Sequence, residues 1–85
     1  MATFVTLINY TEQGIKNVKK APERVADARK AIEAAGGKMI GFYWTLGQYD
    51  AIAIGEAPTD EAYTAIMLSI AGQGNIRSTT LKAFN

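Results

Sequence analysis

Asp50 is the side chain of this sequence with the clearest potential for acid–base chemistry. It stands at the start of an otherwise apolar run in the stretch GFYWTLGQYDAIAI, residues 41–54. A carboxylate in a half-buried strand needs a hydrogen-bonding partner or a raised pKa. Two interpretations stay open. Asp50 has a structural partner, namely Thr45 across a hairpin, turn amides or Arg77, or it is a base or anchor in an interfacial cavity.

Aromatic and polar side chains elsewhere could complete such a site. In that interpretation the tyrosines orient a ligand, and Asn9 or Arg77 stabilises an enolate or phenolate. Trp44 could stack on a ligand, although aromatic residues on a sheet more often belong to a core or a dimer contact. An arginine on an edge strand is more often solvated or in an ion pair than an anion clamp. The candidate binding residues are Asn9, Tyr10, Tyr43, Trp44, Tyr49, Asp50 and Arg77.

The composition excludes several classes of site. The chain contains no cysteine and no histidine. It therefore lacks thiolate zinc sites, disulfides, a cysteine nucleophile, the usual general base near neutral pH and the commonest transition-metal ligand. We expect no metal ion and no bound cofactor, and any catalysis would have to use Asp, Glu, Tyr, Lys or Arg.

Charge and hydropathy limit the partners. Nine basic residues against eight acidic ones give a net charge of +1, which offers no electrostatic footprint for nucleic acid or an anionic membrane. The first residues, MATFVTLINY, lack the features of a signal peptide, and no apolar run approaches the roughly 18 residues of a membrane span. We therefore expect a cytoplasmic protein with neither nucleic acid nor membrane as a partner.

The length of 85 residues predicts one domain, residues 1–85. A composition of 48% hydrophobic and 20% charged residues is typical of a folded chain. A chain of this size hides only about 60% of the surface that its unfolded form exposes, so association with a partner would stabilise it.

Periodicity predicts six main elements. Residues 3–10 alternate as a strand with two apolar faces. Thr11 caps the helical region 12–35, which consists of one short turn and then a longer helix with Pro22 in its first turn and a kink near Ala21. Glycines 36 and 37 end that region. Strands 38–46 and 49–56 follow, joined by a two-residue turn at Gly47 and Gln48, then a helix at about 59–71 capped by Thr59, and a final strand to residue 84.

The hairpin turn predicts a strand register. With Gly47 and Gln48 at the tip, the pairs are Leu46–Tyr49, Thr45–Asp50, Trp44–Ala51, Tyr43–Ile52, Phe42–Ala53 and Ile40–Gly55. A slip of one residue would exchange the two faces of the hairpin, so this register depends on the turn.

The order βαββαβ predicts an α+β fold of the ferredoxin-like type: a four-stranded antiparallel sheet with two helices packed on one face. Because both faces of the strands carry apolar side chains and two helices can cover only one, the other face would be exposed in a lone subunit. We therefore expect a homodimer that packs sheet against sheet as an α/β barrel.

The segment GQYD, Gly47 to Asp50, resembles the Gly-x-Tyr-Asp motif that names the GYD family of small uncharacterised domains. The resemblance extends over FVTLINYTEQGIKN, APERVADARKAIEAAGGKMIGFYWTLGQYD, EAP and GNIRSTTLKAF. It departs at Ala21, where such sequences often carry a capping serine. The resemblance implies a ferredoxin-like, dimeric α/β barrel and no established activity. A more distant similarity, to the ligand-sensing domains of leucine-responsive and asparagine-type regulators, implies an effector site at a sheet-based interface.

Three functions follow from these observations. The first is a small oligomeric binding or interaction module, with a small-molecule ligand between the sheet and its helices or across the dimer. The alternative is a cofactor-independent monooxygenase or isomerase acting on an aromatic or quinone-like substrate, with Asp50 or a tyrosine as the proton acceptor. A purely structural assembly protein, which needs no pocket, is the third.

Overall fold

The computed structural model describes all residues from Met1 to Asn85. The elements are β1 (Ala2–Tyr10), α1 (Glu12–Lys16), the short 3₁₀ helix η1 (Val18–Lys20), α2 (Ala21–Ala34), β2 (Lys38–Trp44), β3 (Ala51–Ala57), α3 (Asp60–Ala71) and β4 (Ile76–Ala83). This order confirms the predicted α+β, ferredoxin-like fold. None of the helices combines the length and the hydropathy needed to span a bilayer.

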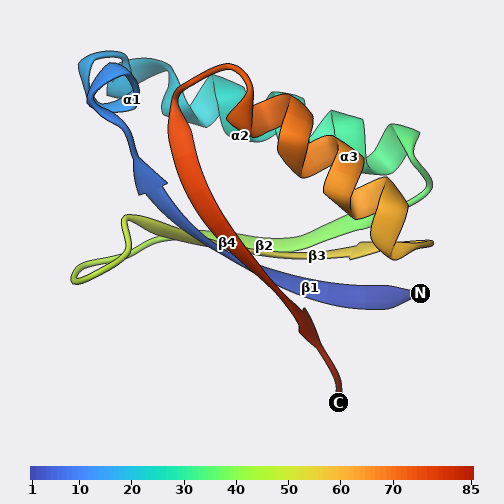
Figure 1. Ribbon diagram of the computed structural model, residues 1–85. Coiled ribbons are helices and arrows are strands. Elements are labelled where there is room, and N and C mark those ends of the chain that lie inside the picture. The colour runs from blue at the N-terminus through green and yellow to red at the C-terminus, as the bar shows by residue number, and fades with distance from the viewer.

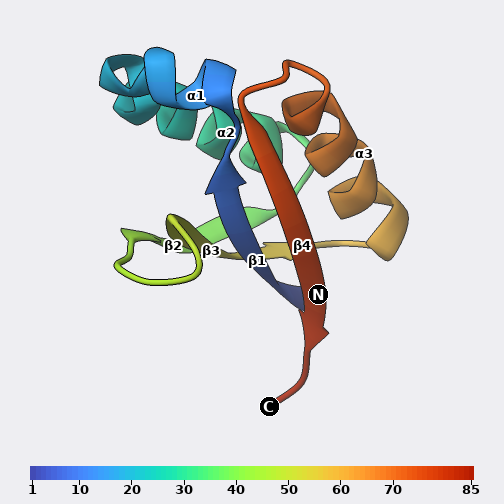
Figure 2. The same cartoon turned by 60° about the vertical axis from the view of Figure 1, so that its left-hand side comes forward.

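The four strands form one antiparallel sheet in the order β2-β3-β1-β4. Helices α2 and α3 both lie on the same side of this sheet, and no helix lies on the other side (Figure 1). The short helix α1 lies beyond the end of β1, near the start of β4 (Figure 2). A backbone hydrogen bond of 3.1 Å from Thr11 N to Asn75 O fixes that position.

The helices begin and end where the sequence predicts. The side chains of Thr11 and Thr59 each accept a hydrogen bond of 3.1 Å from the backbone amide three residues further on, so both are N-caps. Helix α2 begins at Ala21 after η1, with Pro22 in its first turn, as expected for a residue that has no amide hydrogen to donate. Gly36 has a φ of 86° and ends this helical region.

The hairpin register is partly confirmed. Trp44 pairs with Ala51 and Phe42 with Ala53, as predicted. The predicted pair of Ile40 with Gly55 is wrong, because Met39 pairs with Gly55 and a β-bulge leaves Ile40 as an extra residue. The prediction had assumed an unbroken period of two along the strand.

The connection between β2 and β3 is also longer than the predicted two-residue turn. Strand β2 ends at Trp44 and β3 begins at Ala51, so residues 45–50 join them. Thr45 is nevertheless opposite Asp50, since its amide donates to the Asp50 carbonyl at 2.9 Å. Gly47 has a φ of 116°, a conformation that favours glycine at the tip of the loop.

The sheet has two faces of different character. We call the side under the helices the covered face; it carries Phe4, Thr6, Ile8, Met39, Phe42, Trp44, Ala51, Ala53, Gly55, Ala57, Ile76, Ser78 and Thr80. We call the other side the open face; it carries Val5, Leu7, Asn9, Tyr43, Ile52, Ile54, Arg77, Thr79 and Leu81. Tyr43 is 59% exposed and Leu81 51% exposed. Large apolar side chains thus lie on both faces, in agreement with the sequence.

Candidate functional site

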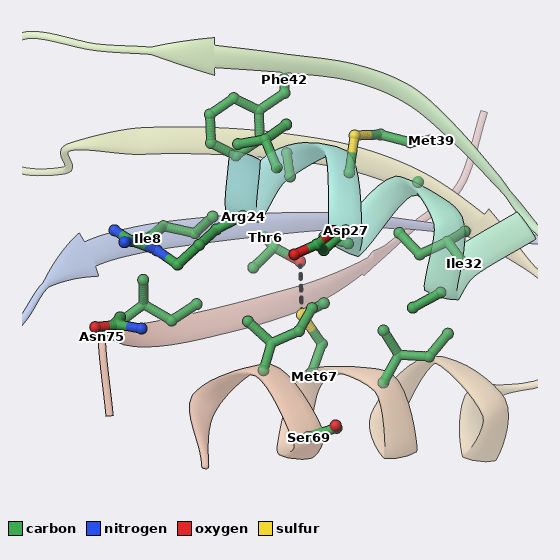
Figure 3. A pocket seen from close by; sticks show the side chains of 18 of the residues that line it. Thr6, Ile8, Arg24, Asp27, Ile32, Met39, Phe42, Met67, Ser69 and Asn75 are labelled. Carbon is green, nitrogen blue, oxygen red and sulfur yellow. Dashed lines mark hydrogen bonds between the residues drawn. The ribbon is translucent and has the colours of Figure 1, made fainter. Parts of the chain in front are cut away.

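A pocket lies between helices α2 and α3 and the covered face of the sheet (Figure 3). Its volume is about 360 Å³, and 17 of the 24 residues that line it are hydrophobic. Pockets that bind small molecules have volumes of roughly 300–1,000 Å³ and mostly apolar walls with a few polar groups. The pocket therefore suits a small molecule whose body is apolar.

Small side chains on facing elements create this space. The alanine and glycine residues that line the pocket come from α2, β3 and α3: Ala21, Ala28, Ala31, Ala53, Gly55 and Ala65. Gly55 also makes room for Tyr63, because a Cβ atom at position 55 would lie 3.2 Å from Cε2 of the Tyr63 ring. Strand β3 consequently places only small side chains under the helices. Tyr63 stacks on Phe4 of β1, with the ring centroids 4.3 Å apart.

The buried hydroxyl groups of Thr6 and Tyr63 form part of the pocket wall. Thr6 Oγ1 and Tyr63 Oη are 2.8 Å apart, and Thr6 Oγ1 and Thr80 Oγ1 are 3.2 Å apart. Burial raises the pKa of Tyr63 above its ordinary value of 10.0, against the smaller opposite effect of the hydrogen bond with Thr6. Tyr63 therefore stays protonated near neutral pH and can act as a hydrogen-bond donor or acceptor, not as a general base.

Arg24 supplies the basic group of the pocket wall. It lies in the first turns of α2, and its Nη1 donates a hydrogen bond of 3.0 Å to the carbonyl of Asn17. Its Nη2 is shielded from solvent and has no hydrogen-bond partner. Every other buried side-chain nitrogen or oxygen of the protein has one. In Figure 3 the Arg24 side chain extends toward the end of the pocket where Asn75 lies.

The structure separates the candidate residues predicted from the sequence. Tyr10 lines the pocket, and the other six do not: Asn9, Tyr43, Trp44, Tyr49, Asp50 and Arg77. Tyr10 also joins the hairpin, because the indole Nε1 of Trp44 donates to its hydroxyl at 2.9 Å. Trp44 in turn packs edge-on against Phe42, with ring centroids 5.0 Å apart. These contacts fix the hairpin beside the end of β1.

Asp50 has a backbone partner on the central strand. Its Oδ2 accepts a hydrogen bond of 2.9 Å from the amide of Tyr10, and its own amide donates to the carbonyl of Ile8 at 2.8 Å. None of the three predicted carboxylate partners, namely the Thr45 side chain, the turn amides and Arg77, makes this contact. The reason lies in the register: β3 begins at Ala51, opposite Ile8, so its pairing with β1 does not reach Tyr10. The carboxylate of Asp50 satisfies the Tyr10 amide instead.

Arg77 is separated from Asp50 by the central strand. Asn9 pairs with Arg77 on β4, and Asp50 follows on the other side of β1. Arg77 and Asn9 are thus neighbours on the open face, on the side of the sheet away from the pocket, and β1 lies between Arg77 and the Asp50 carboxylate.

Sequence reasoning missed three groups of the pocket. Thr6 gave the clearest signal, because its hydroxyl interrupts the apolar covered face of β1. Tyr63 has the spacing of an apolar core residue of its helix, and only the fold shows that its hydroxyl meets Thr6. Arg24 has the spacing of a solvated residue of its helix, and no periodicity shows that the chain at Asn17 folds back against it. No cluster of three or more acidic side chains is placed to hold a metal ion.

Comparison with known protein families matches the GYD domain over residues 4–85. The chain belongs to the GYD domain family. A Thermus thermophilus protein named glutamine synthetase and cystathionine beta-lyase binding protein is 31% identical to this GYD domain over 84 residues, which cover 98% of this chain and 88% of the other.

Solved structures share the fold of this GYD domain. The crystal structure of TTHA0845 from Thermus thermophilus has a TM-score of 0.62 at 23% identity and covers 100% of this chain and 95% of that one. A MhuD variant with two manganese protoporphyrin IX molecules bound per active site has a TM-score of 0.53 at 15% identity, covering 100% of this chain and 94% of that one. At these identities the likeness concerns the fold alone.

Proposed function

We propose that this GYD domain is a homodimeric binding module that holds a small, mainly apolar molecule between α2, α3 and the sheet. The observation that carries the proposal is the pocket itself, which has a volume of about 360 Å³ and a mostly hydrophobic wall. Contact of such an apolar wall with water is unfavourable, so a ligand that covers it would stabilise the domain.

The open face supports the homodimer. It presents Val5, Leu7, Ile52, Ile54 and Leu81 on three adjacent strands, with no helix above them. Complete burial of one such side chain contributes up to about 1.5–3 kcal/mol, and two copies related by a twofold axis would bury the same patch from both sides. In this arrangement the dimer covers the open face and leaves the pocket of each copy free for its ligand.

The ligand part of the proposal is tested with a variant that fills the pocket. Ala28→Phe places a ring in the pocket, because Ala28 lines it, and Ala26→Phe places the same ring on the exposed side of the same helix. Thermal unfolding is followed with a panel of small apolar compounds. A compound at a hundred times its Kd should stabilise the wild type and Ala26→Phe by about 2.7 kcal/mol and leave Ala28→Phe unchanged. Equal stabilisation of both variants, or none of the wild type, would count against the pocket as the site.

The named relative favours a second candidate function, which is binding to a metabolic enzyme. That relative is 31% identical to this chain, and its name states binding to glutamine synthetase and cystathionine beta-lyase. Titration of the purified protein against these two enzymes from its own organism, by isothermal calorimetry, tests this candidate. Binding that is the same for Ala28→Phe and the wild type would assign the interaction to the outer surface. No heat with either enzyme would rule against it.

The position of Asp50 and the burial of Tyr63 disfavour these two groups as the proton acceptor of the enzyme alternative. A cofactor-independent monooxygenase or isomerase needs a proton acceptor beside its substrate. Asp50 lies outside the pocket wall and accepts a hydrogen bond from the amide of Tyr10. Tyr63 does line the pocket, but burial raises its pKa and keeps it protonated.

A further inference from the structure

Arg24 carries a positive charge that the chain itself does not neutralise. A guanidinium has five N–H donors, and that of Arg24 makes a single hydrogen bond, from Nη1 to the carbonyl of Asn17. Its Nη2 is buried without a partner. The two salt bridges of the protein join Lys16 to Glu12 and Lys82 to Asp60, so neither involves Arg24. A shielded, charged donor of this kind is expected to meet an acceptor in the functional state.

One acidic side chain shares the pocket wall with Arg24. Asp27 lies one turn further along α2, is exposed, and forms no salt bridge with the guanidinium. The remaining polar groups of the wall are uncharged: Thr6, Tyr10, Tyr63, Ser69, Gln73 and Asn75. The wall therefore offers one cationic donor for an anion, with a single carboxylate nearby that would disfavour a second negative charge.

The charged and the apolar parts of the pocket lie at opposite ends. Ile32 is eight residues beyond Arg24, about 12 Å along the axis of α2 at the rise of an α-helix. It packs with Met39 and Ile66 in a buried apolar cluster. Figure 3 shows Arg24 extending toward Asn75 at one end of the pocket and Ile32 at the other. A molecule that fills this space would have a polar head at Arg24 and an apolar body of about that length.

We propose that the pocket binds a small apolar monocarboxylic acid, with the carboxylate on Arg24 and the apolar body toward Ile32. This inference rests on the proposed function and names the class of its ligand. A guanidinium binds a carboxylate through parallel N–H···O bonds, and Nη2 has a free donor for one of them. A single negative charge matches one arginine, whereas a dianionic phosphate would leave an excess charge close to Asp27.

The test compares two probes of the same length that differ in charge. Octanoate and octanol are titrated into the full protein by isothermal calorimetry at neutral pH. We expect the wild type to bind octanoate at least tenfold more tightly than octanol. Arg24→Gln should lose this preference and keep its affinity for octanol, while Asp27→Asn should bind octanoate more tightly than the wild type. Arg29→Gln, which changes an exposed arginine of the same helix, should behave as the wild type.

The outcomes separate this inference from the proposed function. Equal affinity of the wild type for octanoate and octanol would overturn the assignment of an acid and leave the apolar pocket in place. A preference for octanoate that survives in Arg24→Gln would overturn the role of Arg24. Failure of the wild type to bind either probe would contradict both the inference and the proposed pocket. The first comparison uses the wild type only, so it holds even if Arg24→Gln does not fold.

Discussion

The two faces of the sheet differ in the size of their side chains on β3. An isolated domain would need the larger apolar side chains under its helices, and here they lie on the open face. On β3 the covered face carries Ala51, Ala53, Gly55 and Ala57, whereas the open face of the same strand carries Ile52 and Ile54. The smaller side chains lie under the helices and the larger ones face outward. The covered face thus leaves space for a molecule, and the open face has exposed bulk, which are the two features on which the proposed ligand site and the proposed homodimer rest.

The largest effect is expected from a charge in the middle of the open face. Leu7 pairs with Ile52 and Thr79 at the centre of this face. Leu7→Lys would bury an ammonium group in the proposed dimer and weaken association by about 2–4 kcal/mol, or roughly thirtyfold to several hundredfold in Kd, as for an interface hot spot. Analytical ultracentrifugation over a dilution series measures this change.

Two variants control for this prediction. Ala26→Lys adds the same charge on the exposed side of α2 and should leave the mass unchanged. Leu81 lies nearer the edge of the open face, so Leu81→Lys should weaken association less than Leu7→Lys. It also tests the interface in a folded protein if Leu7→Lys does not fold. If all three variants keep the mass and Kd of the wild type, the open face is not the interface.

A smaller effect is expected at Asp50, whose carboxylate accepts a hydrogen bond from the backbone of β1. Asp50→Ala removes the acceptor for the amide of Tyr10 and should lower the free energy of unfolding by about 1–2 kcal/mol. Asp50→Asn keeps a side-chain oxygen and should lose less. Urea unfolding measures both, and Glu33→Ala on the exposed surface of α2 is the control. Neither Asp50 variant should alter binding in the pocket; unchanged stability with abolished binding would make Asp50 a ligand-binding group instead.

The smallest effect is expected on the covered face at alkaline pH. Burial raises the pKa of Tyr63 above 10.0, so the unfolded chain releases this proton at a lower pH than the folded one. The contribution of Tyr63 to stability is complete below pH 10.0 and is lost as the pH rises toward the pKa of the folded state. Tyr63→Phe removes the hydrogen bond with Thr6, at a cost of about 1 kcal/mol, and should lack this alkaline decrease. Urea unfolding on both sides of this pH checks the sign. An equal alkaline decrease in Tyr63→Phe and the wild type would assign it to other groups.

Local signals in the sequence predicted most of the fold. Thr11 and Thr59 are caps because each hydroxyl accepts a hydrogen bond from an amide in the first turn of the helix that follows it. Such a contact involves only residues that are close in the sequence. The order of the elements along the chain and the two apolar faces of the strands follow from periodicity. The bulge at Ile40 did not follow, because an extra residue in a strand leaves no mark in a pattern that is apolar on both faces.

The site was harder to predict, because its residues meet only through the tertiary fold. The partner of Asp50 depends on the residue of β1 at which the pairing with β3 begins. That position is set by the register between two strands that are distant in the sequence. Arg24 has the spacing of a solvated helical residue, and its burial results from the turn at Asn17 that η1 places against it. Of the seven candidate residues predicted from the sequence, Tyr10 alone lines the pocket.

Sedimentation equilibrium of the wild-type protein at micromolar concentration tests the difference between the two faces most directly. If the open face is covered by a second copy of the chain, the measured mass will be twice the 9.2 kDa of one chain or a higher multiple of it. A mass of 9.2 kDa at every concentration would contradict the account, because the large apolar side chains of the open face would then face water.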